Sequence, residues 1–153
     1  MSLHNNNITG PIPSEILHHT NLEYLDLSCN NLTGTIPSSA PMQNKLVSGS
    51  SLVVLDLSSN NLSGIIPATL GNLKNLEYLS LSNNNFIGYI RDTIGNLTKL
   101  MLLDLSSNNL RGTIPATFGN LTSLAYLNLS NNRLNGEVPA SLDNLKGLGY
   151  VCC

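Results

Sequence analysis

Leucines recur along most of this chain at one fixed interval. Leu52, Leu76, Leu100, Leu124 and Leu148 lie 24 residues apart, and each opens the same pattern of apolar and polar positions. The pattern reads Leu-x-x-Leu-x-Leu-x-x-Asn-x-Leu-x-Gly-x-Ile-Pro. A fixed period of this length predicts a solenoid of stacked units, because no single unit can bury its own apolar edge.

Each unit predicts one short strand followed by a turn. Leu55 and Leu57 are two residues apart, so they point to one side of an extended strand, and Asp56 points to the other. A glycine and an Ile-Pro pair then turn the chain, and Leu70 and Leu73 at i and i+3 suit a short 3₁₀ or helical turn. We therefore expect a parallel sheet of six to seven short strands, one per repeat, with turns on its opposite side.

An asparagine follows the second strand leucine by three residues in every unit. Its amide supplies donors and an acceptor, so inward-pointing asparagines can satisfy the backbone of a buried turn in their own and adjacent units. We predict a buried structural ladder of Asn6, Asn30, Asn60, Asn84, Asn108 and Asn132.

The whole chain, residues 1–153, is interpreted as one solenoid segment. It begins inside a unit and ends at Cys153, shortly after a unit opens at Leu148, which gives six repeats and the start of a seventh, open at both ends. The interval from Leu22 to Leu52 is 30 residues, six more than the period, and the extra residues fall at 38–43. We expect a surface loop there, because loop-closure entropy grows slowly with length.

The assembled pattern, L-x-x-L-x-L-S-x-N-x-L-x-G-x-I-P-x-x-L-G-N-L, resembles the plant-specific leucine-rich repeat. Residues 55–64 and 119–124 are similar to ectodomains of plant receptor-like kinases and receptor-like proteins. The resemblance implies an α/β leucine-rich repeat solenoid, with the parallel sheet on the concave side and short turns on the convex side. It also implies an extracellular or cell-surface location, a peptide or protein ligand, and a co-receptor as a further partner.

Two alternatives to a receptor-like recognition module stay open. The same repeat occurs in secreted inhibitors of cell-wall-degrading enzymes of the polygalacturonase-inhibitor type. The chain could instead be a truncated repeat fragment without independent function, since the pattern starts and stops within a unit.

Composition and charge exclude several other classes of function. Only 10% of the residues are charged, against roughly 25% in ordinary domains, and the net charge of -2 gives no footprint for nucleic acid. No basic segment followed by an apolar run marks a signal peptide, and no stretch approaches the ~18 apolar residues of a membrane span. We therefore expect no direct membrane insertion by this segment.

The sequence offers no constellation typical of catalysis or of a bound cofactor. Neither G-x-S-x-G, H-E-x-x-H nor C-x-x-C occurs, and Cys29, Cys152 and Cys153 form no disulfide framework. We expect no enzyme, no cofactor and no metal site.

The residues between the strand leucines are the candidate ligand-binding residues of the concave face. They form two predicted columns, which are Tyr24, Val54, Tyr78, Leu102 and Tyr126, and Asp26, Asp56, Ser80, Asp104 and Asn128. Tyrosine is enriched in recognition surfaces. The alternative is that these residues only fill the strand face.

Charge and sequons add two expectations for this surface. Five of the nine acidic residues and no Lys or Arg fall on the concave face, so a partner should be neutral or cationic where it docks. Receptor-like kinases of this type often hold a peptide C-terminus with paired arginines, and this stretch has no such pair. N-glycosylation sequons occur at Asn7, Asn31, Asn61, Asn96, Asn120 and Asn128.

Overall fold

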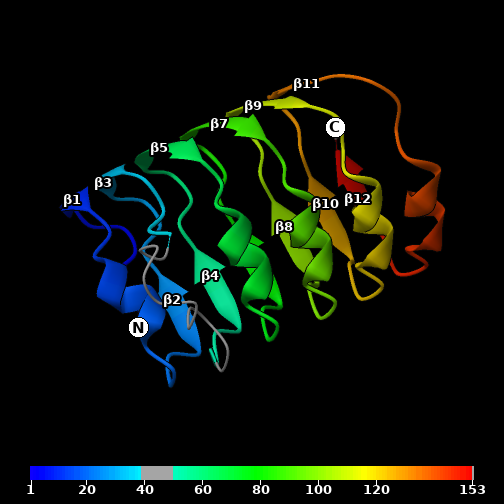
Figure 1. Ribbon diagram of the computed structural model, residues 1–153. Coiled ribbons are helices and arrows are strands. Elements are labelled where there is room, and N and C mark those ends of the chain that lie inside the picture. Colours follow the sequence, from blue (N-terminus) through cyan, green and yellow to red (C-terminus); the bar gives the residue numbers. More distant parts are fainter. Residues whose placement is uncertain (39–49, 153) are drawn as a thin grey trace.

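The computed structural model describes residues 1–38 and 50–152 of the chain. The repeated units lie side by side in chain order, from the amino to the carboxyl end, and form a curved slab (Figure 1). The predicted insertion at 38–43 lies outside the described residues, apart from Ser38.

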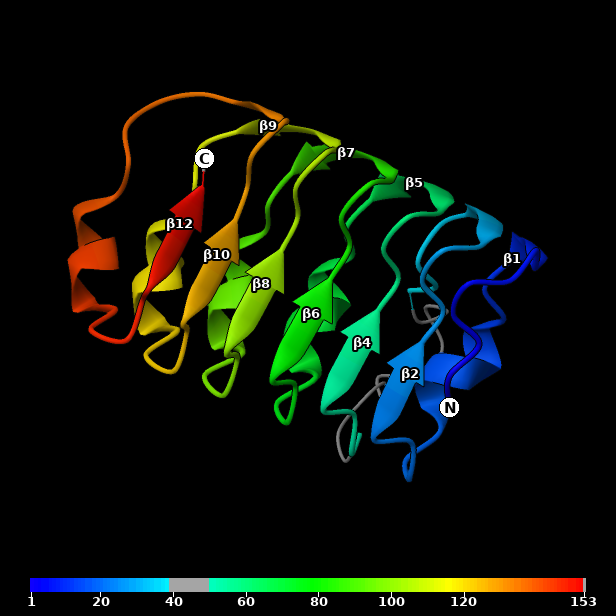
Figure 2. The same cartoon turned by 180° about the vertical axis from the view of Figure 1, so that it is seen from behind.

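The first sheet contains one short parallel strand from each unit. In the described chain it has six strands in the order β12-β10-β8-β6-β4-β2, and it forms the concave side of the solenoid (Figure 2). The strands are β2 (Tyr24–Asp26), β4 (Val54–Asp56), β6 (Tyr78–Ser80), β8 (Leu102–Asp104), β10 (Tyr126–Asn128) and β12 (Tyr150–Cys152). Ser2 adds an isolated parallel bridge to Asp26. The expectation of a parallel sheet built from one strand per unit is confirmed.

A second parallel sheet, which the sequence pattern did not predict, runs along one edge of the slab (Figure 1). Its strands within the described residues are β1 (Thr9–Pro11), β3 (Asn31–Gly34), β5 (Asn61–Ile65), β7 (Asn85–Tyr89), β9 (Asn109–Gly112) and β11 (Arg133–Leu134). Each follows a ladder asparagine, where the sequence suggested only a tight return. The backbone stays extended there, and the neighbouring unit supplies the hydrogen-bond partners.

Short 3₁₀ turns cover the convex side, opposite the first sheet (Figure 1). They are η1 (Ser14–His18), η2 (Ala68–Asn72), η3 (Asp92–Asn96), η4 (Ala116–Asn120) and η5 (Ala140–Asn144). Adjacent turns pack with their backbones close together. A Cβ built on Gly71 would lie only 2.1 Å from the carbonyl oxygen of Thr93, so the absence of a side chain at Gly71 allows this packing. Among the described residues, no helix has the length and apolar character needed to cross a membrane.

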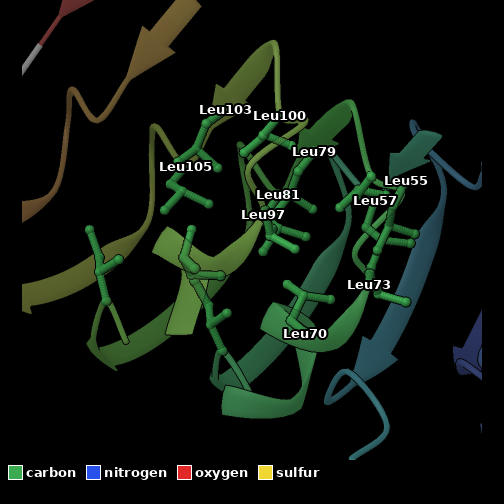
Figure 3. Packing of buried hydrophobic residues seen from close by; sticks show 14 of the residues in the cluster. Leu55, Leu57, Leu70, Leu73, Leu79, Leu81, Leu97, Leu100, Leu103 and Leu105 are labelled. Carbon is green, nitrogen blue, oxygen red and sulfur yellow. The ribbon is translucent and has the colours of Figure 1, made fainter. Parts of the chain in front are cut away.

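The core lies between the first sheet and the turns, and leucine fills most of it. Leu55, Leu79 and Leu103 from the strands have no exposed surface, and they point toward Leu70 and Leu97 from the turn side (Figure 3). Complete burial of such a side chain stabilises a fold by about 1.5–3 kcal/mol. The core is one continuous cluster across the units, so each unit depends on its neighbours.

The ladder asparagines connect adjacent units. Asn84 accepts a hydrogen bond at Oδ1 from the amide of Leu62 (2.9 Å) and donates from Nδ2 to the carbonyls of Leu57 (2.9 Å), Leu81 (3.3 Å) and Ser82 (3.1 Å). Asn30, Asn60, Asn108 and Asn132 make the same set of bonds. The side chain therefore joins backbone groups of two units.

Burial along the ladder depends on the neighbouring units. Asn30, Asn84 and Asn108 are buried, whereas Asn60 and Asn132 are half-buried. Asn6 is exposed, so the expectation of burial was wrong at this position. Its Nδ2 donates only to Leu3 and His4 of its own unit, because the described chain has no unit before it.

Candidate functional site

Parallel pairing in register brings the two predicted columns of the concave face together. Tyr24, Val54, Tyr78, Leu102, Tyr126 and Tyr150 are successive Cα partners, and so are Asp26, Asp56, Ser80, Asp104, Asn128 and Cys152. Neighbouring strands lie about 4.8 Å apart. The first series therefore forms an unbroken row of aromatic and aliphatic side chains across the strands of the first sheet, which we call the tyrosine row.

The middle of the tyrosine row is half-buried and its ends are exposed. Val54, Tyr78, Leu102 and Tyr126 keep intermediate exposure, while Tyr24 is exposed. The rings of Tyr126 and Tyr150 are stacked, with centroids 4.5 Å apart and planes inclined by 4°. The stacking fixes the orientation of these two rings at one end of the row.

The aspartates beside this row are partly occupied by their own turns. Asp56 accepts at Oδ1 from the amide (2.9 Å) and the hydroxyl (2.6 Å) of Ser58, and at Oδ2 from the hydroxyl of Tyr78 (3.3 Å). Asp104 makes the corresponding two bonds to Ser106. One oxygen of each carboxylate therefore fixes the turn after the strand, and the other faces the surface of the sheet.

Contacts on this face raise the pKa of Tyr78 and lower the pKa of Asp26. Burial, the charge of Asp56 and the hydrogen bond to it raise the pKa of Tyr78 to about 12. At Asp26 burial acts to raise the pKa, but hydrogen bonds from Ser28 and the proximity of His4 outweigh it, so the pKa is lowered. At neutral pH the face therefore presents neutral phenols beside negative carboxylates.

Two of the predicted ligand-binding residues have little accessible surface. Asp26 is 8% exposed and Ser80 is 3% exposed. Ser80 is short, and its hydroxyl lies 3.2 Å from that of Ser82. The hydroxyl of Tyr24 donates to Asp26 (3.4 Å). The more accessible positions of the two columns are therefore the whole tyrosine row and the half-buried members of the second column, Asp56, Asp104 and Asn128.

His4 is a residue of this face that the repeat pattern did not single out. Its Nδ1 lies 3.4 Å from Oδ2 of Asp26 and 2.8 Å from the hydroxyl of Ser2. His4 occupies the position that Ser28 and Ser58 hold in later units. The replacement of the usual serine by histidine at this position is the sequence feature that could have identified His4 as a residue of this face.

The sequon asparagines fall into two groups. Asn7, Asn31, Asn61, Asn96 and Asn120 are exposed. Asn128 lies on the concave face, where its Oδ1 accepts from the amide (3.2 Å) and the hydroxyl (2.8 Å) of Ser130. A glycan would be attached at Nδ2 of Asn128, which donates to the hydroxyl of Tyr126 (3.4 Å). Asn128 is also half-buried, which makes it the least accessible of the six.

Metal binding finds no support in the described part of the chain, where no group of three His, Cys, Asp or Glu side chains could hold an ion.

Comparison with known proteins relates this surface to plant receptors. The family described as "Leucine-rich repeat region" matches residues 35–152, and the "Leucine Rich Repeat" matches residues 21–41. The chain is similar to the ectodomain of the Arabidopsis thaliana receptor kinase GASSHO1/SCHENGEN3, solved with CASPARIAN STRIP INTEGRITY FACTOR 2. The two are 40% identical with a TM-score of 0.90, over 98% of this chain and 17% of that one.

Two further Arabidopsis ectodomains show the same similarity. The receptor kinase HAESA, solved with an N-terminally extended IDA peptide hormone, is 36% identical with a TM-score of 0.89, over 97% of this chain and 24% of that one. SOBIR1 is 31% identical with a TM-score of 0.78, over 91% of this chain and 72% of that one. The chain thus spans only about a sixth to a quarter of GASSHO1/SCHENGEN3 and HAESA. No curated protein sequence matches it.

Proposed function

Because this chain belongs to the leucine-rich repeat family, we propose that it is a recognition module whose concave face binds an extended segment of a peptide or protein. The similar ectodomain of HAESA was solved in complex with a peptide hormone ligand, and that of GASSHO1/SCHENGEN3 in complex with CASPARIAN STRIP INTEGRITY FACTOR 2. By the same similarity, the module is part of a receptor-like protein outside the cell or at its surface, with a co-receptor as a further partner. This likeness favours the receptor role over a polygalacturonase-type inhibitor.

The tyrosine row is the observation that carries this proposal. Tyr78, Leu102 and Tyr126 lie on neighbouring strands, in register and half-buried. Aromatic groups that become buried at an interface contribute hot spots of about 2 kcal/mol or more. A bound segment that crosses the strands would contact several members of the row at once.

The negative charge of the concave face limits which partners can bind there. Glu23, Asp26, Asp56, Glu77 and Asp104 share the concave face with no Lys or Arg. A neutral or cationic segment docks without repulsion, whereas a free carboxylate does not. We therefore propose that a peptide carboxylate, where the partner has one, is held outside this stretch.

A binding role without catalysis fits the local chemistry of the face. The hydroxyls of Ser58 and Ser106 donate to carboxylates and not to an imidazole that could accept a proton. We assign no nucleophile, cofactor or metal to the site.

The repeat organisation and the sequons belong to the same proposal. The chain is one solenoid segment of six repeats and the start of a seventh, with an insertion at 38–43. The exposed sequons, with Asn96 and Asn120 at the ends of two convex turns, are the proposed glycosylation sites.

Selection of peptides on the chain tests the site. A random dodecapeptide library is selected on the immobilised 153-residue chain, and the selected peptides are measured against the double variant Tyr78→Ala/Tyr126→Ala. We expect neutral or basic peptides, and a loss of affinity of at least about tenfold in the double variant.

The control variant is Asn72→Ala, which removes an exposed side chain at the end of a convex turn. It should bind the selected peptides as the parent does, and both proteins should keep the parent far-ultraviolet spectrum. Unchanged binding by the double variant, or binding abolished by Asn72→Ala, would refute the assignment of the site.

A further inference from the structure

The outer surface of the second sheet carries large apolar side chains that remain exposed. Ile65 of β5 is 49% exposed, and Ile87 and Tyr89 of β7 are 51% and 52% exposed. Ile65 and Ile87 are Cα partners across these two strands. Together with Arg111 of β9, whose Cα partner is Tyr89, they form what we call the second-sheet patch.

Contacts between units hold the patch in place. The ring of Tyr89 covers Gly112, since a Cβ built on that glycine would lie 2.4 Å from Cδ1 of the ring. The guanidinium carbon of Arg111 lies 5.2 Å from the centroid of the same ring. Ile65 covers Gly88 in the same way, at 3.0 Å. One side of Ile65 and one side of Tyr89 therefore pack against the neighbouring unit, so a partner that contacts their other side has less conformational entropy to remove.

The arginines of the chain gather at this patch. The sequence contains three, Arg91, Arg111 and Arg133, and all are exposed. Arg111 and Arg133 are Cα partners in the second sheet, and Arg91 lines a shallow hollow together with Thr35 and Ile65. Among the described residues, none of the three forms an ion pair with a carboxylate.

The two faces of the solenoid thus differ in charge. The concave face carries five carboxylates, whereas the second-sheet patch carries guanidinium groups around an apolar centre. Some other units carry smaller polar residues at the positions of Tyr89 and Ile87. Thr113 and Thr35 are equivalent to Tyr89, and Ser63 and Thr33 are equivalent to Ile87. The fold itself therefore does not require large apolar residues at these two positions.

We propose that the second-sheet patch docks a second protein partner, whose contact surface is acidic around an apolar centre. The three arginines pair with acidic residues at the rim of the partner's contact surface, and Ile65, Ile87 and Tyr89 contact the apolar centre of that surface. The chain would then hold one partner on its concave face and another along its edge. This inference concerns a different surface from the proposed peptide site and does not depend on it.

The observations favour an acidic protein over other occupants. Symmetric pairing of two copies through this patch would bring arginine against arginine, which opposes association. Anionic membranes attract clusters of about four to eight basic residues, more than the three present. The patch is also a fixed sheet surface with ordered side chains, which suits a shaped protein surface.

The test uses variants that copy residues from equivalent positions of this chain. Tyr89→Thr follows Thr113, and Arg111→Ser follows Ser63, so the double variant Tyr89→Thr/Arg111→Ser should keep the fold. A random dodecapeptide library is selected on the chain carrying Tyr78→Ala/Tyr126→Ala, which removes the tyrosine row from competition.

We expect the selected peptides to carry Asp and Glu around an aromatic or aliphatic residue, and to lose at least about tenfold in affinity for the double variant. Amide shifts measured by NMR should map their binding to β5, β7 and β9. Selected peptides that lack acidic residues, or that bind the double variant equally well, would overturn the proposal.

Two further measurements separate the other occupants. Sedimentation with phosphatidylserine vesicles that is lost in the double variant would assign the patch to a membrane surface and reject a protein partner. A dimer that dissociates on the same substitutions would assign it to a second copy. Failure of this proposal leaves the peptide site intact, because that site is measured with Tyr78 and Tyr126.

Discussion

Replacement of a central ladder asparagine should have a large effect on stability. In Asn84→Ala the amide of Leu62 loses its partner, whereas the carbonyl of Leu57 keeps a bond from Asn60 and that of Leu81 keeps one from Asn108. One buried N–H therefore remains without an acceptor.

The expected cost follows from these bonds. An unsatisfied buried donor costs about 1–3 kcal/mol, and the lost donor bonds from Nδ2 contribute about 1 kcal/mol net. We expect the free energy of unfolding to fall by about 3 kcal/mol. This is a large fraction of the ~5–15 kcal/mol that stabilises a typical protein.

Asn6→Ala is the matched control, since it is the same substitution at the exposed end of the same ladder. The side-chain amide of Asn6 donates to the carbonyls of Leu3 and His4, and water can replace both bonds. We expect its cost to stay below about 1 kcal/mol.

Urea unfolding followed by circular dichroism measures both variants, with the slope against urea compared to detect any departure from two-state behaviour. Equal costs for Asn84→Ala and Asn6→Ala would refute the argument, because they would show that the bonds between units contribute nothing beyond those within a unit.

Three further predictions concern the backbone and the tyrosine row. Gly112→Ala should destabilise the chain by about 1–3 kcal/mol, since φ is +83° and the new Cβ would meet the ring of Tyr89. Gly147→Ala, whose Cβ would make only an ordinary contact of 3.9 Å with the carbonyl oxygen of Leu124, should cost little in the same urea assay. Ser107→Asn should raise the melting temperature slightly, because φ is 53° at this position and asparagine tolerates the left-handed region better than serine. The raised pKa of Tyr78 means that the folded state holds its proton more tightly than the unfolded state, so this stabilising contribution is complete below pH ~10 and lost as the pH rises toward 12. Tyr78→Phe should flatten the loss of stability between pH 10 and 12, and an unchanged pH profile would contradict the assignment.

The repeat, its strands and its asparagine ladder were predictable because their signals are local and recur. Two leucines separated by one residue define an inward strand face wherever they occur, and the fixed period places equivalent residues opposite each other in the parallel sheet. The tyrosine row follows from the same rule, since Tyr78 and Tyr126 hold equivalent positions and strand pairing preserves the register.

The burial of individual site residues could not be predicted from the repeat pattern of the sequence. Asp26 and Asp56 have the same local sequence, Leu-Asp-Leu-Ser, yet Asp26 is buried and Asp56 is half-buried. The difference comes from the side chains around each carboxylate, including His4 beside Asp26. Such contacts join residues of different units, which a periodic sequence pattern treats as equivalent.

The amino-acid sequence by itself determined the period, the inward leucines, the ladder positions and the composition of the concave face, because each depends on residue spacing within one unit. Only the tertiary structure decided the second sheet and the patch on it. A segment such as Asn85–Tyr89 has no strong strand pattern of its own, and it becomes a strand because stacked units bring two extended backbones within hydrogen-bonding distance. The position of Tyr89 over Gly112 likewise exists only between units, where the absence of a Cβ in one repeat makes room for the ring of another.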